Sequence, residues 1–389
     1  MAETTHNSTV APFDRVSDVN VIMTVIHPRP VTGLGNLLIL NPVTPPAQPA
    51  DGKAGDTTAL PDKLSGDDIM NGILLRKTDP DSGAMYREYK TIDAVANDYP
   101  EKSDVWNKAS TYFAQSNHSD RIAVLDYDPS KAYDALKAFW YFNWAFAIQA
   151  VSKVDKDTTY LSNIFEKNKD HFLVLQSNTP ADFEELMGQN YTVGLKHDTT
   201  EAMDAAFVGA NATLPVGSIT WKFKELSGIA SETLTTTELE GINNLKLIAY
   251  ISVNGRDETS EGWTLSGEYI DVLHGILWVK TNVQGKLENF LQENGKVPYE
   301  QRGIIQLSGV VTQVLQQAYE QGIILTNDAT GKADYTVTTT SRDEQSQTDL
   351  SARHYGGLSF AYHVSGAIHT ITVNGQVQSD TVLVKGGNR

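Results

Sequence analysis

Two glycine-containing motifs have residue types that could bind a ligand, but both motifs are incomplete. The segment Gly33 to Gly35 could hold a dinucleotide phosphate, because glycines allow close approach of a backbone to a pyrophosphate. It lacks the third glycine and the following helix that such a site needs. The run from Asp79 to Gly83, with Glu88, is spaced like a calcium loop, but its glycine stands one position early and its fifth-position ligand is lost. We interpret both segments as tight turns.

Other residues that carry catalysis or bind metals form no recognisable pattern. The nine histidines contain no His-x-x-x-His pair, so a helical zinc site is not predicted. His363 and His369 could approach each other across neighbouring strands, which we interpret as a structural pair and not a metal site. There is no cysteine, no Gly-x-Ser-x-Gly elbow and no phosphate-binding loop. We expect no catalytic residue, no cofactor, no metal and no enzyme activity; scattered carboxylates that pair in space, as in an unrecognised hydrolase, remain the alternative.

The charge and apolar content narrow the classes of partner. The 389 residues include 31 Lys and Arg against 48 Asp and Glu, a net charge of −17. Such an acidic chain repels phosphate, so we expect no nucleic-acid partner. The longest apolar stretch, Phe139 to Val151, is interrupted by Asn143 and Gln149 and is shorter than the roughly 20 residues of a membrane span. Its aromatic start, Phe139 to Trp144, indicates a packed core, with a partner-binding patch as the alternative.

The apolar pattern before residue 254 predicts an α/β layer. Residues 19–26 and 37–40 are apolar at successive positions, which is typical of strands covered on both faces. Residues 41–83 are rich in Pro, Gly and Asp and indicate a surface excursion or linker. Residues 86–253 alternate short strands, among them 219–223, with helices such as 179–187. This alternation favours a partly parallel sheet.

The last third of the chain has a different pattern. Two long amphipathic helices are predicted at 269–292 and 299–321. Strands are predicted at 335–340, 358–364 and 368–373. Asn374-Gly375 favours a tight hairpin, and residues 377–384 would form its returning strand.

Three groups of residues together resemble the tail-sheath-like family of contractile bacteriophages. Their order and spacing match as well as their residue types, over about residues 19–325. The residues are Tyr89–Tyr99 with Ala109, Tyr112–Gln115 and Ile122–Val124; Ile219–Lys224 with Leu226, Gly228 and Ile229; and Gly262, Gly267–Asp271 and Trp278.

The resemblance implies an α/β (α+β) fold with an inner domain built from both chain ends, an inserted α/β outer domain and extended terminal arms. On this expectation residues 1–30 are an N-terminal arm, and residues 31–84 are an inner-domain strand with the Pro- and Gly-rich excursion. Residues 85–253 are the inserted outer domain, residues 254–366 the inner domain of long helices and strands, and residues 367–389 a C-terminal arm or hairpin.

The resemblance also implies that the arms add strands to sheets of neighbouring subunits, a mode in which main-chain hydrogen bonds give affinity. The alternative is that both segments are ordinary strands of their own domain. The candidate inter-subunit residues are apolar at alternate positions: Val19, Val21, Met23, Val25, Ile371, Val373, Val382 and Val384.

The function that the resemblance implies is structural. The chain would be a subunit of a contractile tail sheath that polymerises helically around the tail tube and contracts to drive the tube into the host envelope. Its partners would be copies of itself, the tail tube protein, the baseplate and the tail terminator, in a virion tail assembled in the host cytoplasm. A tail tube or baseplate component is the alternative within the same machine, and a host-surface-binding module is the alternative from another class.

Overall fold

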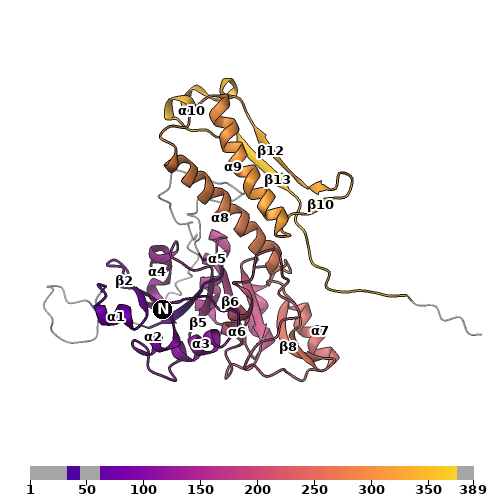
Figure 1. Cartoon of the computed structure of the whole chain (residues 1–389). Helices are drawn as coiled ribbons and strands as arrows, with labels where there is room; N and C mark the ends of the chain where they lie inside the picture. The colour runs from indigo at the N-terminus through magenta and orange to yellow at the C-terminus, as the bar shows by residue number, and fades with distance from the viewer. Residues whose placement is uncertain (1–32, 44–61, 375–389) are drawn as a thin grey trace, which may run out of the picture.

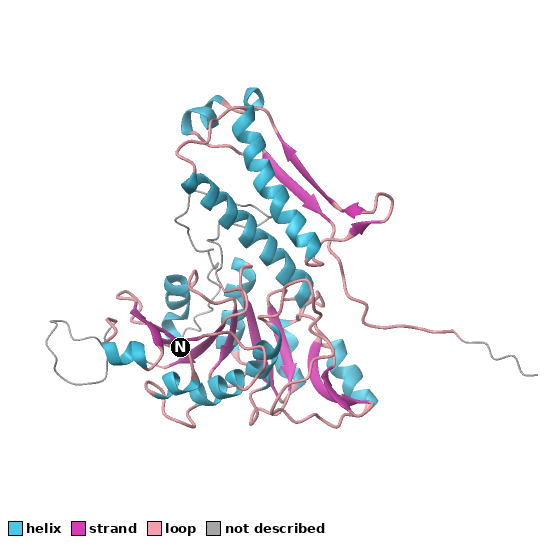
Figure 2. Ribbon diagram, viewed as in Figure 1, coloured by secondary structure: helices cyan, strands magenta, loops and turns pink. Residues whose placement is uncertain are grey.

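The computed structural model describes residues 33–43 and 62–374, which form two packed parts (Figure 1). An α/β body holds the described residues as far as Thr259. A layer of two long helices and a small sheet stands on one side of this body (Figure 2). The described chain ends at a distance from both parts (Figure 1). The α/β fold class predicted from the sequence is confirmed.

The body is built on a nine-stranded sheet with the order β2-β3-β4-β1-β5-β6-β7-β8-β9. The six strands from β4 to β8 in this order are parallel, while β2, β3 and β9 pair antiparallel at the two ends. The strands are β1 (Leu37–Pro42), β2 (Ile73–Thr78), β3 (Met85–Tyr89), β4 (Ile122–Tyr127), β5 (Phe146–Gln149), β6 (Phe172–Ser177), β7 (Thr192–Lys196), β8 (Leu247–Val253) and β9 (Arg256–Thr259).

Helices connect these strands and cover the sheet. Continuous apolar runs such as Leu37 to Leu40 are fully buried, as expected for parallel strands covered on both faces. Thr91 begins one helix as predicted, since its side chain accepts a hydrogen bond from the Ala94 amide. The helices are α1 (Gly66–Met70), α2 (Ile92–Ala96), α3 (Asp104–Phe113), α4 (Ala132–Phe139), α5 (Lys156–Asn168), α6 (Met203–Asn211) and α7 (Thr236–Asn244), with 3-10 turns at Pro129–Lys131 and Pro180–Leu186.

The position of β1 corrects the expected division of the chain. Residues 31–84 were expected to belong to an inner domain outside the α/β part. Instead β1 lies between β4 and β5 in the middle of the sheet, and β2 forms its edge. The body also extends past the expected boundary at residue 253, because β9 pairs with β8. Parallel strands are joined by long crossover connections, so the neighbours of a strand in the sheet can lie far from it in the sequence.

Two local predictions in the body are wrong. Ile219–Phe223 was predicted to be a strand but is irregular, because Phe223 has a positive φ of 65° and the chain turns there. The turn places Trp221 in the core, where the centroid of its ring lies 5.0 Å from that of the Phe207 ring. The predicted helix at 179–187 is a 3-10 turn, opened by Pro180 without a side-chain cap at Thr179.

The interpretations of the short motifs are confirmed. Gly33 has a φ of +78° and accepts a hydrogen bond from the Asn36 amide, which makes a tight turn. Asp79 accepts a bond from the Gly83 amide and closes the turn between β2 and β3. The aromatic run is core packing: Trp140 and Trp144 are fully buried and contact each other edge to face.

The helical layer is built on α8 (Ile270–Glu293), which is shared by two cores. Its first part packs into the core of the body through Ile270, Leu273 and Leu277. Its second part packs against α9 (Gln301–Glu320), with Val279 and Val283 in the other core. The layer also contains β10 (Thr326–Asn327), β11 (Lys332–Ala333), β12 (Tyr335–Thr339), a 3-10 turn at Arg342–Glu344, α10 (Gln347–Ala352) and β13 (Leu358–Tyr362). Both predicted long helices and the first two strands after them are confirmed, with ends shifted by one or two residues. Within the described ranges, no helix combines the length and apolar composition that crossing a bilayer would need.

Candidate assembly interface

The two-stranded sheet of β12 and β13 has one apolar and one polar face. The strands are antiparallel, with Val337 opposite Phe360. Side chains at alternate positions pack on the second core beside α9, as the period-2 pattern of a strand requires. On the outer face Thr336, Thr338 and Ala361 are exposed. The sheet therefore lies on the helices with its apolar face covered.

Both outer edges of this sheet lack a strand partner in the part of the chain that the structure describes. Only β12 and β13 belong to it. A sheet of two strands is marginally stable by itself, and its free edges present N–H and C=O groups to any strand that can pair with them. Neither strand contains a charged residue. The edges are therefore neutral, extended backbone available for pairing.

The chain after β13 forms an exposed apolar arm. Residues 366–374 make no strand, which corrects the predicted strand at 368–373 within the chain's own fold. Ile368, Ile371 and Val373 are 78%, 80% and 85% exposed. Three solvent-exposed, branched apolar side chains within six residues are unusual on a folded surface. Figure 1 shows this segment leaving the molecule beside the small sheet.

Of the candidate inter-subunit residues, only two lie in the described part of the chain. These two, Ile371 and Val373, are on the exposed arm. The remaining candidates, and Gly375 of the predicted hairpin, lie outside the described residues: Val19, Val21, Met23, Val25, Val382 and Val384.

His363 and His369 each have structural partners, and the described ranges hold no metal site. His363 Nδ1 lies 2.9 Å from Asp334 Oδ2, whereas His369 contacts Thr220 and Glu261 in the body. Each therefore has partners of its own. No group of three metal-ligating side chains occurs among residues 33–43 and 62–374.

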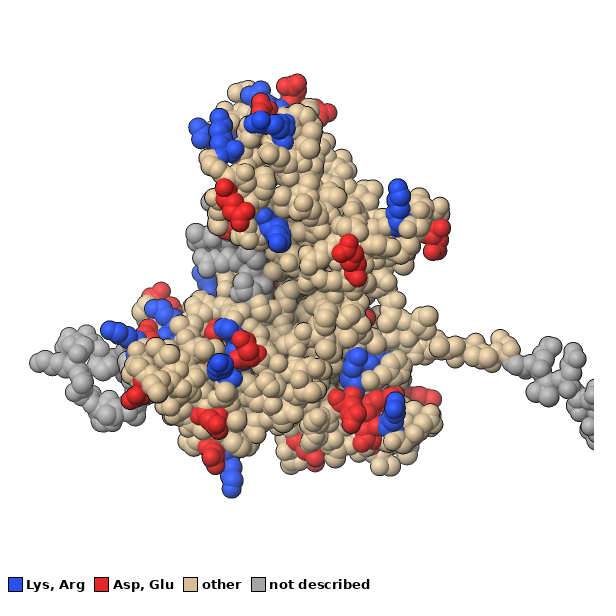
Figure 3. Space-filling model, in the orientation of Figure 1, with Lys and Arg blue, Asp and Glu red and all other residues tan. Residues whose placement is uncertain are grey.

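Charged side chains are distributed unevenly over the surface. Figure 3 shows carboxylates gathered over the end of the body where α7 and β8 lie. Exposed acids of that region include Glu238, Glu240 and Asp257. On the visible face of the helical layer, basic and acidic side chains are interspersed (Figure 3). Acidic repulsion between copies would therefore act mainly on the body.

Comparison with known proteins identifies the architecture. Residues 270–377, which include the helical layer and the exposed arm, match the family model of the E217 tail sheath protein gp31-like C-terminal domain. A chain of the anti-feeding prophage helical sheath in its contracted state matches with a TM-score of 0.53 and 12% identity, over 96% of this chain and 100% of that one. The chain has a contractile-sheath fold. The predicted resemblance to the sheath-like family is thereby confirmed.

Two further structures extend this comparison. A chain of the sheath complex of an extracellular contractile injection system, PVC, in the contracted state matches this sheath-like chain with a TM-score of 0.58 and 10% identity, covering 94% of it and 99% of that chain. A chain in the anti-feeding prophage baseplate has a TM-score of 0.57 and 13% identity, with coverage of 96% and 100%. No curated protein sequence matches. At such low identities the likeness concerns the fold.

Sequence reasoning did not predict what surrounds the arm. The free edges of β12 and β13 give no signal in a single sequence, because the Thr-rich outer face looks like that of any solvated strand. The contact of His369 with the body was also missed. Its partners Thr220 and Glu261 stand more than 100 positions earlier, and no local period connects them.

Proposed function

We propose that this chain is the structural, non-enzymatic subunit of a contractile sheath that polymerises helically around a tail tube and contracts to drive the tube into a host envelope. The observation that carries the proposal is the exposed apolar arm beside a sheet whose two edges have no partner among the described residues, in a chain with a sheath fold along almost its whole length.

Strand exchange between copies is the proposed link. Ile371 and Val373 are two positions apart, so they lie on one face of an extended chain. If a neighbour's arm pairs with the edge of β12 or β13, this apolar face continues the face that packs on α9. Covering each of the two side chains contributes about 1.5–3 kcal/mol, in addition to the main-chain hydrogen bonds. The candidate strands at 19–25 and 382–384 would act in the same way.

Such a contact is heterologous, since a donor arm meets an acceptor sheet on another copy. A heterologous contact that does not close into a ring generates a helix, which is the symmetry that a sheath requires. Contraction then needs two packings of the same subunit, with one of them trapped. Strand pairing allows this change, because main-chain bonds can persist while whole subunits rotate.

The proposed domain roles follow the two cores. The helical layer with the arms would form the inner part next to the tube, and the nine-stranded body would form the outer part. This division assigns 33–43 and 62–259 to the outer part and 270–366 to the inner part. The partners would be further copies of the chain, the tube protein, the baseplate and the tail terminator. The subunit would assemble in the host cytoplasm and act in the virion tail.

A baseplate component is the second candidate. It is favoured by one observation, the match to a chain in the anti-feeding prophage baseplate structure. A baseplate subunit would form closed rings or mixed complexes. A sheath subunit would form striated tubes of open length.

Electron microscopy of the purified chain tests the proposal. Striated tubes or short stacked rings support a sheath, whereas a compact monomer at high concentration contradicts it. The arm is tested with the double variant Ile371→Asp/Val373→Asp, which should stay folded and lose assembly. The matched control is Met70→Asp, since Met70 is 86% exposed but lies on α1 in the body. Loss of folding in the arm variant would contradict strand exchange and favour a strand of the chain's own domain.

A further inference from the structure

The chain that follows β13 is fixed to its own subunit at two places of different kind. The first place is held by main-chain hydrogen bonds, beside the side-chain pair of His363 with Asp334. His363 N donates to Asp334 O at 3.1 Å and its carbonyl accepts from Leu325 N at 2.9 Å, while Ser365 N donates to Ile323 O at 2.9 Å. These bonds extend the pairing of β13 into the helical layer. We call residues 363–369 the C-terminal strap, which includes the first residues of the arm, 366–369.

The second place is the side chain of His369 alone. Its Nε2 lies 2.7 Å from Thr220 Oγ1, and its Nδ1 lies 3.4 Å from Glu261 Oε2. The ring packs edge to face on Tyr269, with centroids 4.7 Å apart, and more distantly on Phe223. His369 is 9% exposed, although both of its neighbours in the chain are exposed. One side chain therefore docks the end of the strap on the body.

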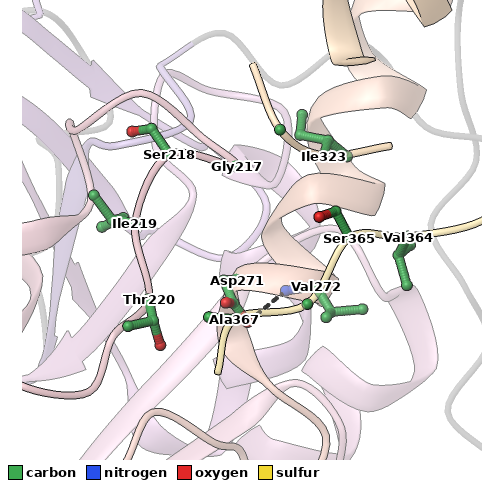
Figure 4. A pocket seen from close by; sticks show the side chains of 12 residues that line it. Gly217, Ser218, Ile219, Thr220, Asp271, Val272, Ile323, Val364, Ser365 and Ala367 are labelled. Carbon is green, nitrogen blue, oxygen red and sulfur yellow. Dashed lines mark hydrogen bonds between the residues drawn. The ribbon is translucent and has the colours of Figure 1, made fainter. Parts of the chain in front are cut away.

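Between these two places the strap crosses open space. A cavity of about 300 Å³ lies beneath it, with Gly217 and Thr220 on the body side and Asp271 at the start of α8 (Figure 4). Gly366 and Ala367 line it from the strap, and a Cβ on Gly366 would meet nothing within 4 Å. From Gly366 to residue 374, no amide donates a main-chain hydrogen bond to another described residue. The strap thus has a free pivot at Gly366.

The charges around His369 are mixed. Glu261 also accepts a bond from Lys222 Nζ at 2.5 Å, so its charge is shared between two partners. Burial raises the pKa of Asp271, and the nearby His369 acts in the opposite direction. The site therefore combines one cation and two carboxylates with two aromatic rings. The docking depends on several weak contacts to one ring, which can be broken in one step.

We propose that His369 is a releasable latch, which holds the C-terminal arm on its own body in the free subunit and opens about Gly366 when a second copy of the chain binds the arm. The main-chain hydrogen bonds of the first place, including the one from Ser365, persist in both states. This inference rests on the proposed function, because only an arm bound by a neighbour would pull on the latch. Opening lets a linked arm change direction without breaking the pairing of β13.

Distances between two nitroxide labels on the free subunit test the latch. The sequence has no cysteine, so labels attach only to introduced ones. Thr372→Cys places one label on the arm, and Glu240→Cys places the other on the exposed surface of α7. In dilute subunits we expect one narrow distance distribution. His369→Ala should broaden it, because losing one hydrogen bond and one ring contact lowers the closed-to-open ratio about thirty-fold.

Two further variants separate the latch from general destabilisation. His363→Ala is the matched control: His363 lies on the same strap but is exposed and pairs with Asp334, so the distribution should stay narrow. Thr220→Val removes the hydrogen-bond partner from the other side and should broaden the distribution partly. A narrow distribution in His369→Ala, or a broad one in the parent protein, overturns the latch.

The same labels test release in the assembled state. One labelled subunit in ten is mixed with unlabelled subunits, and tubes are formed. A shifted distance supports release. Tubes with the free-subunit distance overturn release while the proposed function stands. If no tubes form, the proposed function fails and release fails with it, whereas the latch of the free subunit is judged by the first measurement.

Discussion

A buried ion pair joins the helical layer to the body and gives the sharpest test of how the two parts are connected. Lys280 in α8 donates from Nζ to Asp170 Oδ1, which precedes β6, at 2.6 Å. The two side chains are 6% and 2% exposed. We predict that Lys280→Met destabilises the protein by about 3–5 kcal/mol, since it leaves the buried carboxylate without its cation.

The magnitude follows from two opposing energies. At an effective dielectric constant near 20, charges about 4 Å apart attract by about 4 kcal/mol. Removing both ions from water costs several kcal/mol each, so the intact pair contributes little net stability. When one ion is removed, the desolvation cost of the other is no longer offset by attraction. When both charges are removed, no such cost remains. The double variant Lys280→Met/Asp170→Asn should therefore recover most of the loss.

Urea unfolding followed by circular dichroism measures these changes. The matched control is Lys77→Met, because Lys77 pairs with Asp62 at 3.5 Å on the exposed surface and should cost less than about 1 kcal/mol. A loss below about 1 kcal/mol in Lys280→Met would refute the reasoning about burial. Separate unfolding transitions of the two parts in the parent protein would refute a different step, namely that α8 makes both cores one cooperative unit.

Three further predictions concern pH, packing and assembly. Burial lowers the pKa of His274 to about 4, from about 6.5 in the unfolded chain. The free energy of unfolding should therefore be full above pH 6.5 and fall as the pH drops towards 4, by about 2 kcal/mol at pH 5. The variant His274→Gln should flatten that part of the denaturation profile. Gly194→Ala should destabilise the protein by about 1–3 kcal/mol in thermal melts, because the new Cβ would lie 2.5 Å from a methyl of Leu247. The new Cβ of Gly241→Ala in α7 meets open space, so this variant should stabilise the protein by about 0.5–1 kcal/mol. Because the net charge is −17, tube formation followed by light scattering should speed up from low to moderate salt, and an absence of any salt effect would exclude acidic repulsion as a brake on assembly.

The sequence predicted elements well where their pattern is local. The 3.6-residue period of α8 and α9 places both helices to within one or two residues, because one apolar stripe on each must be buried. The turn at Gly33 and the cap at Thr91 follow from the chemistry of single residues. The same reasoning interpreted Trp140 and Trp144 correctly as core.

The sequence predicted poorly whatever depends on pairing between distant segments. The apolar run of β1 indicates a buried strand, but nothing local places it between β4 and β5, which come more than 80 residues later. Trp221 was assigned to a strand within the alternation of strands and helices over residues 86–253, yet its ring packs into the tertiary core and the chain bends at Phe223. Of the candidate interface, Ile371 and Val373 were named as arm candidates on the resemblance, while the acceptor edges and the contact of His369 were not predicted.

The two cores constrain where a sheath subunit of this fold could bend. A helix buried at one end in the body and at the other against α9 cannot flex between them without exposing apolar side chains such as Leu277 and Val279. Each exposed side chain of that size costs about 1.5–3 kcal/mol. Residues 366–374 have no such cost, because their apolar side chains are exposed already and the pivot is a glycine over a cavity. Motion between linked subunits should therefore concentrate in the strap and the arm, and the body with its helical layer should move as one piece.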